Sequence, residues 1–363
     1  MNIVKVRSPF FIEVNEIGQI GSKIELSIWN KGTAEPTSGQ TGFYSLSKPI
    51  ASATQINTSY NVSNFVKDFI DNIRPQLVTF PSVEDNNEWC LFKVKRYKLV
   101  GETYTLLDTI EYVGVNGFTN YVDGVNDIVV VSQPEPAYAL INPSIVHYRH
   151  GQAYNYVNII CEPEPVEFDL IALYYNSDTN AYIHEETILN NWANEEIYNY
   201  KVPLTYGTTK NQVLYIAYEQ TIITIYSKTI EECKYTPVVC SFINRYGGWQ
   251  FLTFFKAQTN SVNVSGSSFK LAPANIDYNT FKGQSKAFNI NGTQTIKLNT
   301  GFVDENYSEL ITDLMLSEKI LLDDIYPVKI KTQSSELKNS LKDKLINYEI
   351  DFEYNYDLIN NVQ

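Results

Sequence analysis

Histidine, a common general base and metal ligand, is scarce in this sequence and occurs only at His147, His150 and His184. His147 and His150 would share one face of a helix, but the surrounding residues favour a strand followed by a turn. On a strand, positions separated by an odd number of residues point to opposite faces, so the two imidazoles would not share a metal. His184 lacks the second histidine of a zinc-protease HExxH pattern. We therefore expect all three histidines to be packed or exposed, with no metal site.

Paired carboxylates occur at residues 185–186, 195–196 and 323–324. Adjacency in the sequence does not place two acids on opposite sides of a sugar ring, as a glycosidase requires. The sequence also has no nucleophile elbow, P-loop, dinucleotide-binding glycine fingerprint or EF-hand loop. We predict that the protein is not an enzyme and has no catalytic, cofactor-binding or metal-binding residues. A polysaccharide hydrolase is the weakest alternative.

The chain carries a net charge of −13, which repels nucleic acid phosphates and argues against a specific nucleic acid partner. The basic run at residues 93–98 alternates with Val94 and Tyr97, so we interpret it as the solvated face of a strand. The four cysteines are too few and too widely spaced for a disulfide scaffold or a zinc site. No signal peptide or transmembrane stretch is apparent, and we expect folding in a cytoplasm and no membrane partner.

Aromatic and β-branched residues are abundant in the 363-residue sequence, which contains 27 Tyr and 18 Phe but only 2 Met. This composition is typical of pleated, half-buried sheets rather than of helix bundles. Tyr also suits protein interfaces, because its ring is apolar and its hydroxyl can form a hydrogen bond. We predict a mainly β, multi-domain fold of immunoglobulin-like β-sandwiches with one or two short helices.

We expect the first domain, an immunoglobulin-like β-sandwich, to span residues 1–131. Apolar and polar residues alternate over residues 24–28, which predicts a strand with one solvated face. An apolar pattern at helical spacing follows Ser63, which we expect to cap a helix that ends before Pro75. Residues 89–113 predict two paired strands with a glycine between them. Short strands at regular intervals are typical of such a sandwich.

A second β-sandwich is predicted over residues 132–240. Its boundary with the first domain is the stiff, proline-rich stretch at residues 132–136, where each proline fixes its own φ and removes a hydrogen-bond donor. Strongly β-forming runs follow at residues 155–160, 168–175 and 212–226.

The third domain, residues 241–363, is predicted to be β-rich with one helix near residues 304–322. The Asn291-Gly292 pair accepts two positive φ values, which predicts a hairpin over residues 286–298. In residues 346–357 apolar side chains occupy every second position and face one side of a strand, while carboxylates lie on the other. We interpret these carboxylates as solubilising groups that protect a sheet edge. A cation site or a basic partner is the alternative.

Residues 242–255, at the start of the third domain, predict a hairpin that forms part of the core. The Gly247-Gly248 pair suits a tight turn between its two strands. We expect Trp249 and Phe251 to pack on one face of the second strand.

Part of this hairpin, the Asn-Arg-Tyr-Gly-Gly-Trp-Gln sequence of residues 244–250, resembles a segment of virion proteins from phages that infect Bacteroidetes. Residues 313–318 and 346–354 resemble the helix and the ending of the same proteins. Residues 7–13 and 44–48 fit this similarity. The motifs are most similar to those of the tail ring proteins of crAss-like phages.

This resemblance implies a structural subunit of a bacteriophage tail ring, collar or barrel that assembles with copies of itself into a multimeric ring. It also implies that adjacent tail or portal-proximal virion proteins are partners, and that the protein folds in the host cytoplasm and is located in the virion tail. The alternative is a carbohydrate-binding or adhesion module of a virion, with Trp192 as a sugar platform.

Overall fold

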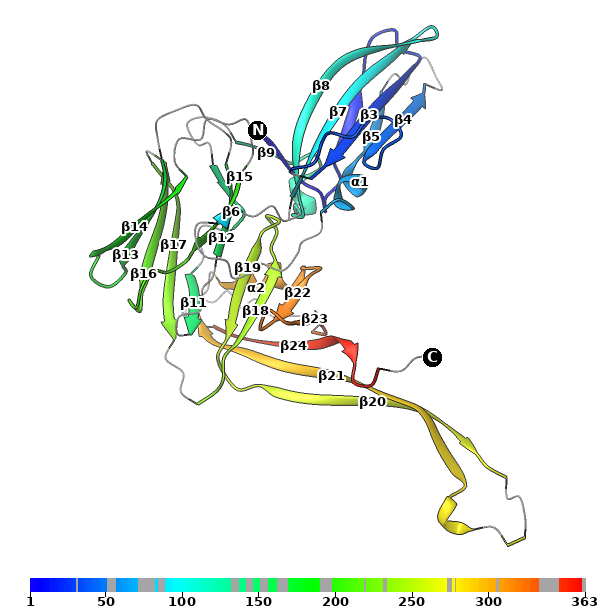
Figure 1. Ribbon diagram of the computed structural model, residues 1–363, viewed down its shortest axis with the longest axis vertical. Helices are drawn as coiled ribbons and strands as arrows, with labels where there is room; N and C mark the ends of the chain where they lie inside the picture. The colour runs from blue at the N-terminus through cyan, green and yellow to red at the C-terminus, as the bar shows by residue number, and fades with distance from the viewer. Residues whose placement is uncertain are drawn as a thin grey trace.

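The computed structural model shows a mainly β protein with three lobes, and a long two-stranded hairpin projects from the third lobe (Figure 1). The part of the chain that the structure describes contains two short α-helices. The predicted fold class, several β-sandwich sheets with one or two short helices, is therefore confirmed. The structure describes residues 1–363 except 31, 51–56, 71–81, 84–88, 132–136, 142–145, 151–155, 162–168, 190–197, 219, 231–233, 273–275, 278, 305–306, 333–345 and 361–363.

The first lobe packs a six-stranded sheet against a two-stranded sheet and a short helix. The strands of the larger sheet, in their spatial order, are β4 (Phe43–Pro49), β3 (Gly21–Trp29), β7 (Trp89–Val100), β8 (Thr103–Val115), β1 (Asn2–Lys5) and β9 (Ile128–Val130). The smaller sheet pairs β2 (Phe11–Val14) with β5 (Thr58–Asn61). The predicted strand pair is confirmed as the β7–β8 hairpin. Ile24, Leu26 and Ile28 of β3 are buried between the sheets, as their alternation predicts.

The helix of the first lobe, α1 (Ser63–Lys67), is shorter than predicted within the described residues and begins differently. Its N-cap is Val62, which makes no side-chain cap hydrogen bond, so the predicted capping by Ser63 is wrong. The Ser63 hydroxyl instead accepts a hydrogen bond from the Phe10 amide at 2.7 Å and donates one to the Ser8 carbonyl at 2.8 Å. Ser63 therefore holds the N-terminal segment against the helix.

The second lobe is a sandwich of a four-stranded and a five-stranded sheet. The first sheet contains, in spatial order, β10 (Ala137–Ala139), β12 (Tyr156–Cys161), β15 (Tyr198–Pro203) and β6 (Ser82–Val83). The second contains β11 (Val146–His150), β17 (Gln220–Ile230), β16 (Gln212–Tyr218), β13 (Leu170–Asn176) and β14 (Tyr182–Leu189). Aliphatic side chains such as Ile159, Leu214 and Ile225 fill the space between the sheets.

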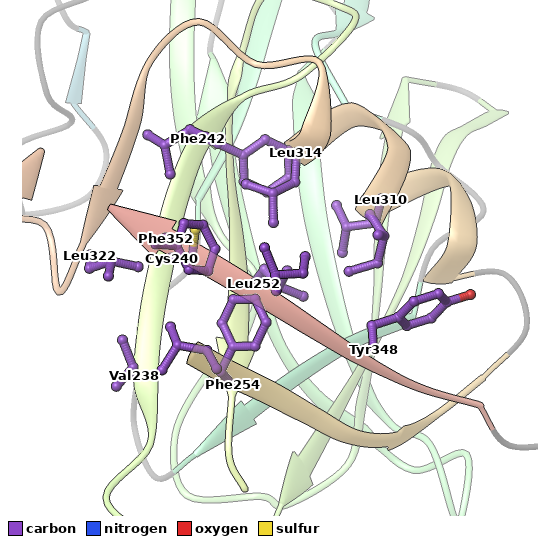
Figure 2. Close-up of a cluster of buried hydrophobic side chains, with 14 of the residues drawn as sticks. Val238, Cys240, Phe242, Leu252, Phe254, Leu310, Leu314, Leu322, Tyr348 and Phe352 are labelled. Carbon is purple, nitrogen blue, oxygen red and sulfur yellow. The ribbon is translucent and has the colours of Figure 1, made fainter. Parts of the chain in front are cut away.

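The third lobe is a seven-stranded sheet with helix α2 (Tyr307–Met315) packed on one face. Its strands, in spatial order, are β19 (Trp249–Phe254), β18 (Val238–Ile243), β22 (Ile320–Leu322), β23 (Tyr326–Ile330), β24 (Ile346–Asp357), β21 (Ser285–Val303) and β20 (Thr259–Lys270). Figure 2 shows Leu310 and Leu314 of α2 above the apolar side chains of the sheet. Two single 3-10 turns, η1 (Tyr121–Asp123) and η2 (Thr280–Lys282), complete the elements.

The predicted helix near residues 304–322 is correct in its buried face but too long. Tyr307, Leu310 and Leu314 are buried against the sheet, and burying each leucine stabilises the fold by about 2 kcal/mol. The helix ends at Met315, and Ile320–Leu322 forms strand β22 between β18 and β23. The apolar residues at the end of the predicted helix are thus buried by strand pairing instead.

The prediction of a hairpin turn at Asn291-Gly292 is wrong. Strand β21 runs without interruption through both residues, and the hairpin closes between β20 and β21, beyond Lys270. The Asn291 side chain accepts hydrogen bonds from the Gly292 and Ile359 amides and donates one to the Ile359 carbonyl at 3.0 Å. It therefore fixes the end of the chain beside β21 and takes no part in a turn.

Candidate functional site

The end of the β20–β21 hairpin projects from the body of the protein, as seen in yellow at the lower right of Figure 1. We call the described residues of the range 264–292 the arm, because strand β24 stops pairing with β21 at Thr293. Every residue of β20 is exposed, and a strand of its length spans about 40 Å. A two-stranded hairpin with no covered face is at best marginally stable by itself in water. The arm is therefore suited to binding another surface.

Apolar side chains occur along both faces of the arm and at its tip. Val264 and Phe269 lie on opposite faces of β20, because an odd number of positions separates them. Phe269 packs edge-on against Phe288 of β21, with ring centroids 5.6 Å apart. Ile276 and Phe281, near the tip, are both 98% exposed. Exposed apolar groups concentrated in one element are typical of an interaction site.

A second exposed apolar surface lies at the end of β24, where this strand continues beyond the buried core of the third lobe. Tyr354 and Tyr356 continue the side of β24 that carries the buried Phe352, and Tyr326 of β23 packs edge-on against Tyr354 at 6.0 Å. We call Tyr326, Tyr354 and Tyr356 the tyrosine strip. Burial raises the pKa of the Tyr354 hydroxyl, and the nearby Tyr356 and Asp323 raise it further. Tyr326 and Tyr356 remain 43% and 42% exposed, so their rings are available for contact.

The predicted alternation in β24 is confirmed for its first half, where Ile346 to Phe352 are buried at every second position. The carboxylates of the opposite face do not protect a sheet edge, because β24 lies between β23 and β21. Glu349 binds Lys297 of β21 at 2.7 Å, and Glu353 binds Lys329 of β23 at 2.7 Å. The lysine hydrogen bonds lower the pKa of both carboxyls. Lysines of the same sheet thus neutralise much of this face.

The predicted hairpin at residues 242–255 is present as β18 and β19, with Trp249 and Phe251 both buried. Its turn lies where the three lobes meet. The Asn244 side chain accepts hydrogen bonds from the Tyr246 and Gly248 amides and donates one to the Leu140 carbonyl of the second lobe at 2.8 Å. Asn244 is fully buried, so the turn is fixed by bonds shielded from water.

The same turn also binds the first lobe through its backbone. The Phe118 amide donates a hydrogen bond to the Arg245 carbonyl at 2.8 Å. A Cβ atom at Gly117 would lie 2.5 Å from that carbonyl oxygen, and one at Gly248 would lie 2.5 Å from the Leu140 carbonyl oxygen. Glycine is therefore required at both positions, because the backbones of the three lobes approach without side chains between them.

Ion pairs at helix α2 reinforce this junction. Arg245 Nε donates to Asp313 Oδ1 at 2.7 Å, and the Asp313 side chain is only 3% exposed. Three residues beyond the C-terminal end of the helix, Glu318 binds Arg7 at 3.4 Å and Lys67 at 2.9 Å, both from the first lobe. Burial raises the pKa of Asp313, and the hydrogen bond from Arg245 opposes this effect. Removal of the Arg245 guanidinium would leave the buried Asp313 carboxylate without its cationic partner.

Of the three histidines, the structure describes the side chain of His184. His147 and His150 lie in β11, at positions whose side chains are outside the described part. His184 Nε2 lies 2.9 Å from Glu186 Oε2, and its ring stacks on Tyr206 with centroids 3.6 Å apart. His184 is therefore a packed residue, held between a carboxylate and an aromatic ring.

The other candidate side chains are mostly engaged in structural contacts. Asp323 accepts a hydrogen bond from the Val239 amide at 3.0 Å. In the basic run of β7, Lys93 binds both Glu35 and Glu111 at 2.7 Å. The run therefore lies in a strand, as its alternation predicts, and Lys93 is paired with carboxylates of neighbouring segments. Trp192 and the carboxylates of residues 195–196 lie outside the described residues.

A depression of about 360 Å³ lies beside the start of β20 and is lined by residues that include Lys256, Lys297, Phe302 and Glu349. Within the described ranges, no three His, Cys, Asp or Glu side chains are grouped so that they could hold a metal ion, and no helix is long and apolar enough to cross a membrane.

Sequence reasoning missed the arm and the tyrosine strip as a surface. The available signal for the arm was a stretch of Ser, Asn and Thr with isolated apolar residues, which cannot bury a core.

Comparison with known proteins adds no identification, since no family model matches the chain and no curated protein matches it.

Proposed function

We propose that the protein is a structural subunit that assembles with copies of itself into a multimeric ring in a bacteriophage tail. The observation that carries this proposal is the arm, which extends into solvent with both faces exposed. An element of this kind gains its stability from a partner, because its apolar groups are buried only when something covers them.

A tail ring also fits the rest of the molecule. Three lobes that contact each other through buried hydrogen bonds form a firm body, which a repeated assembly requires. Contacts between two different surfaces of the same subunit close into a ring when the rotation between neighbours is suitable. The acidic chain would not bind DNA that passes through such a ring, because its charge repels phosphates.

The mass of the purified full-length protein in solution tests this function. Light scattering after size-exclusion chromatography, over a range of concentrations, should give a multiple of the subunit mass, and electron microscopy should show rings. A subunit that remains monomeric at high micromolar concentration and is absent from purified phage particles would contradict the proposal.

The exposed tyrosines favour one second candidate, a carbohydrate-binding module of a virion. Tyr326 and Tyr356 could form a platform for a sugar ring, since aromatic faces bind apolar sugar surfaces. This candidate leaves the arm without a role. A glycan array should then show binding that Tyr326→Ala removes and that deletion of the arm tip leaves intact.

A further inference from the structure

We propose that the arm of one subunit docks onto the tyrosine strip of the next subunit, head to tail. This inference rests on the proposed function and names the two surfaces that form each contact. The occupant of the strip is therefore a second copy of this chain.

Charge is the first argument for a second copy. The arm contains three lysines, Lys270, Lys282 and Lys286, and one acidic residue, Asp277, so its net charge is +2. The whole chain has a net charge of −13, so the body of every copy is strongly acidic. A basic arm is attracted to the acidic body of a neighbour, and this attraction orients the encounter.

The chemistry of the two surfaces is complementary. In the sequence of the arm, Lys282 follows Phe281 and Lys286 lies two residues before Phe288, and both rings are exposed. The strip presents tyrosine rings with Asp323 nearby, whose charge acts on Tyr354. Lysine ammonium groups bind the faces of aromatic rings as well as carboxylates, and aromatic pairs add to the buried area. Tyrosine is also among the residues that contribute most to interface energy.

The order of the strands argues against contact between the arm and the strip of the same subunit. The arm and the strip belong to one continuous sheet, in which β21 pairs with β24 and β24 pairs with β23. From its base beside β24, the arm runs away from β23 and β24, the strands that carry the strip (Figure 1). Ile276 and Phe281 near its tip are both 98% exposed, so they do not pack on the strip of their own subunit. The strip of the same subunit is therefore out of reach, whereas that of a neighbour is accessible.

The contact joins two different surfaces, so it is heterologous, and each subunit donates one arm and accepts another. This arrangement predicts a specific result for mixtures. A subunit with a defective arm still has a functional strip, and a subunit with a defective strip still has a functional arm. Together they can form one contact, and the chain of contacts then stops.

The experiment uses three full-length variants. The arm variant Ile276→Asp/Phe281→Asp changes two residues that are 98% exposed, and the strip variant is Tyr326→Ser/Tyr356→Ser. The control is Ile17→Asp, which places one aspartate at an isoleucine of the first lobe that is 92% exposed. Circular dichroism checks that each variant is folded.

Native mass spectrometry should find the wild type and the control as multimers and both surface variants as monomers. An equimolar mixture of the two surface variants should give a dimer of one arm variant and one strip variant. A single Phe281→Ala substitution should weaken association about tenfold or more.

Other outcomes overturn the inference in distinguishable ways. If the wild type is multimeric and the arm variant is equally so, the inference fails while the proposed function stands. If both variants are monomeric but the mixture contains no dimer, the arm contacts something other than the strip. If the wild type is itself monomeric and sediments with phosphatidylglycerol vesicles through its arm, both proposals fail and the arm is a membrane-binding element.

Discussion

Replacing Arg245 by methionine should destabilise the junction of the three lobes by about 3 kcal/mol. The substitution removes the guanidinium that binds Asp313 Oδ1 at 2.7 Å and leaves a carboxylate that is 3% exposed. Breaking a buried ion pair by removing one partner costs about 3–5 kcal/mol, because the remaining charge stays desolvated. The backbone amide of Arg245 still donates to Asp313 Oδ2 at 3.4 Å, so we expect the lower end of this range.

The loss should depend on pH. Burial raises the pKa of Asp313 above its usual 3.8 in the wild type, and Arg245→Met removes the guanidinium, whose hydrogen bond and charge oppose this effect. Between the unfolded and the folded pKa, the folded state binds more protons than the unfolded state, so stability falls as the pH rises. The variant should therefore be least stable at neutral pH and should approach the wild type as the pH is lowered toward 3.8.

Urea unfolding followed by tryptophan fluorescence measures the effect, since Trp249 is buried beside this turn. The double variant Arg245→Met/Asp313→Leu should recover most of the lost stability, because neither charge then remains buried. Lys297→Met is the control, since Lys297 and Glu349 form a pair whose side chains are 48% and 49% exposed, and its midpoint should hardly change. An Arg245→Met variant with the wild-type midpoint at neutral pH, or a double variant no better than the single, would refute this reasoning.

Three further predictions concern the junction and the core. Gly248→Ala should lower the unfolding temperature in calorimetry, because its Cβ would lie 2.5 Å from the Leu140 carbonyl oxygen, whereas Gly266→Ala in the arm meets mainly a side chain and should change it little. Asn244→Ala should cost about 3 kcal/mol in urea unfolding, because buried backbone groups lose their partners; an unchanged midpoint would contradict this. In a Cys233→Ser background, the other three thiols should resist a disulfide reagent until the protein unfolds, because burial raises the pKa of each; rapid labelling of the folded protein would contradict this.

Local patterning was sufficient where a strand has one buried face along its length. The alternation from Ile346 to Phe352 predicted β24 because each apolar residue lies against the core of the third lobe. It did not predict the role of the carboxylates on the other face. Their lysine partners come from β21 and β23, and the pairing of distant strands is not visible in a local pattern.

Local patterning failed where pairing with a distant strand overrode a local preference. Asn291-Gly292 favours a turn, but β20 extends opposite it and continues the ladder, with a bulge between Ser265 and Ser267. The end of the predicted helix has suitable apolar spacing, but β18 pairs with Ile320–Leu322 as a strand. The arm could not be predicted as a surface, because its few apolar residues belong to no core within the chain.

The glycines of the junction affect how accurately copies of the protein can be arranged. Where Gly117 and Gly248 meet the carbonyl oxygens of other lobes, no side chain can change rotamer to absorb a shift. The angle between the first and third lobes is therefore set by a main-chain hydrogen bond, and that between the second and third lobes by the bond from the buried Asn244 side chain; such bonds tolerate little distortion. In a closed circle of identical units, a small angular error recurs at every unit and accumulates. A stiff joint inside each unit keeps that error small enough for the last unit to meet the first.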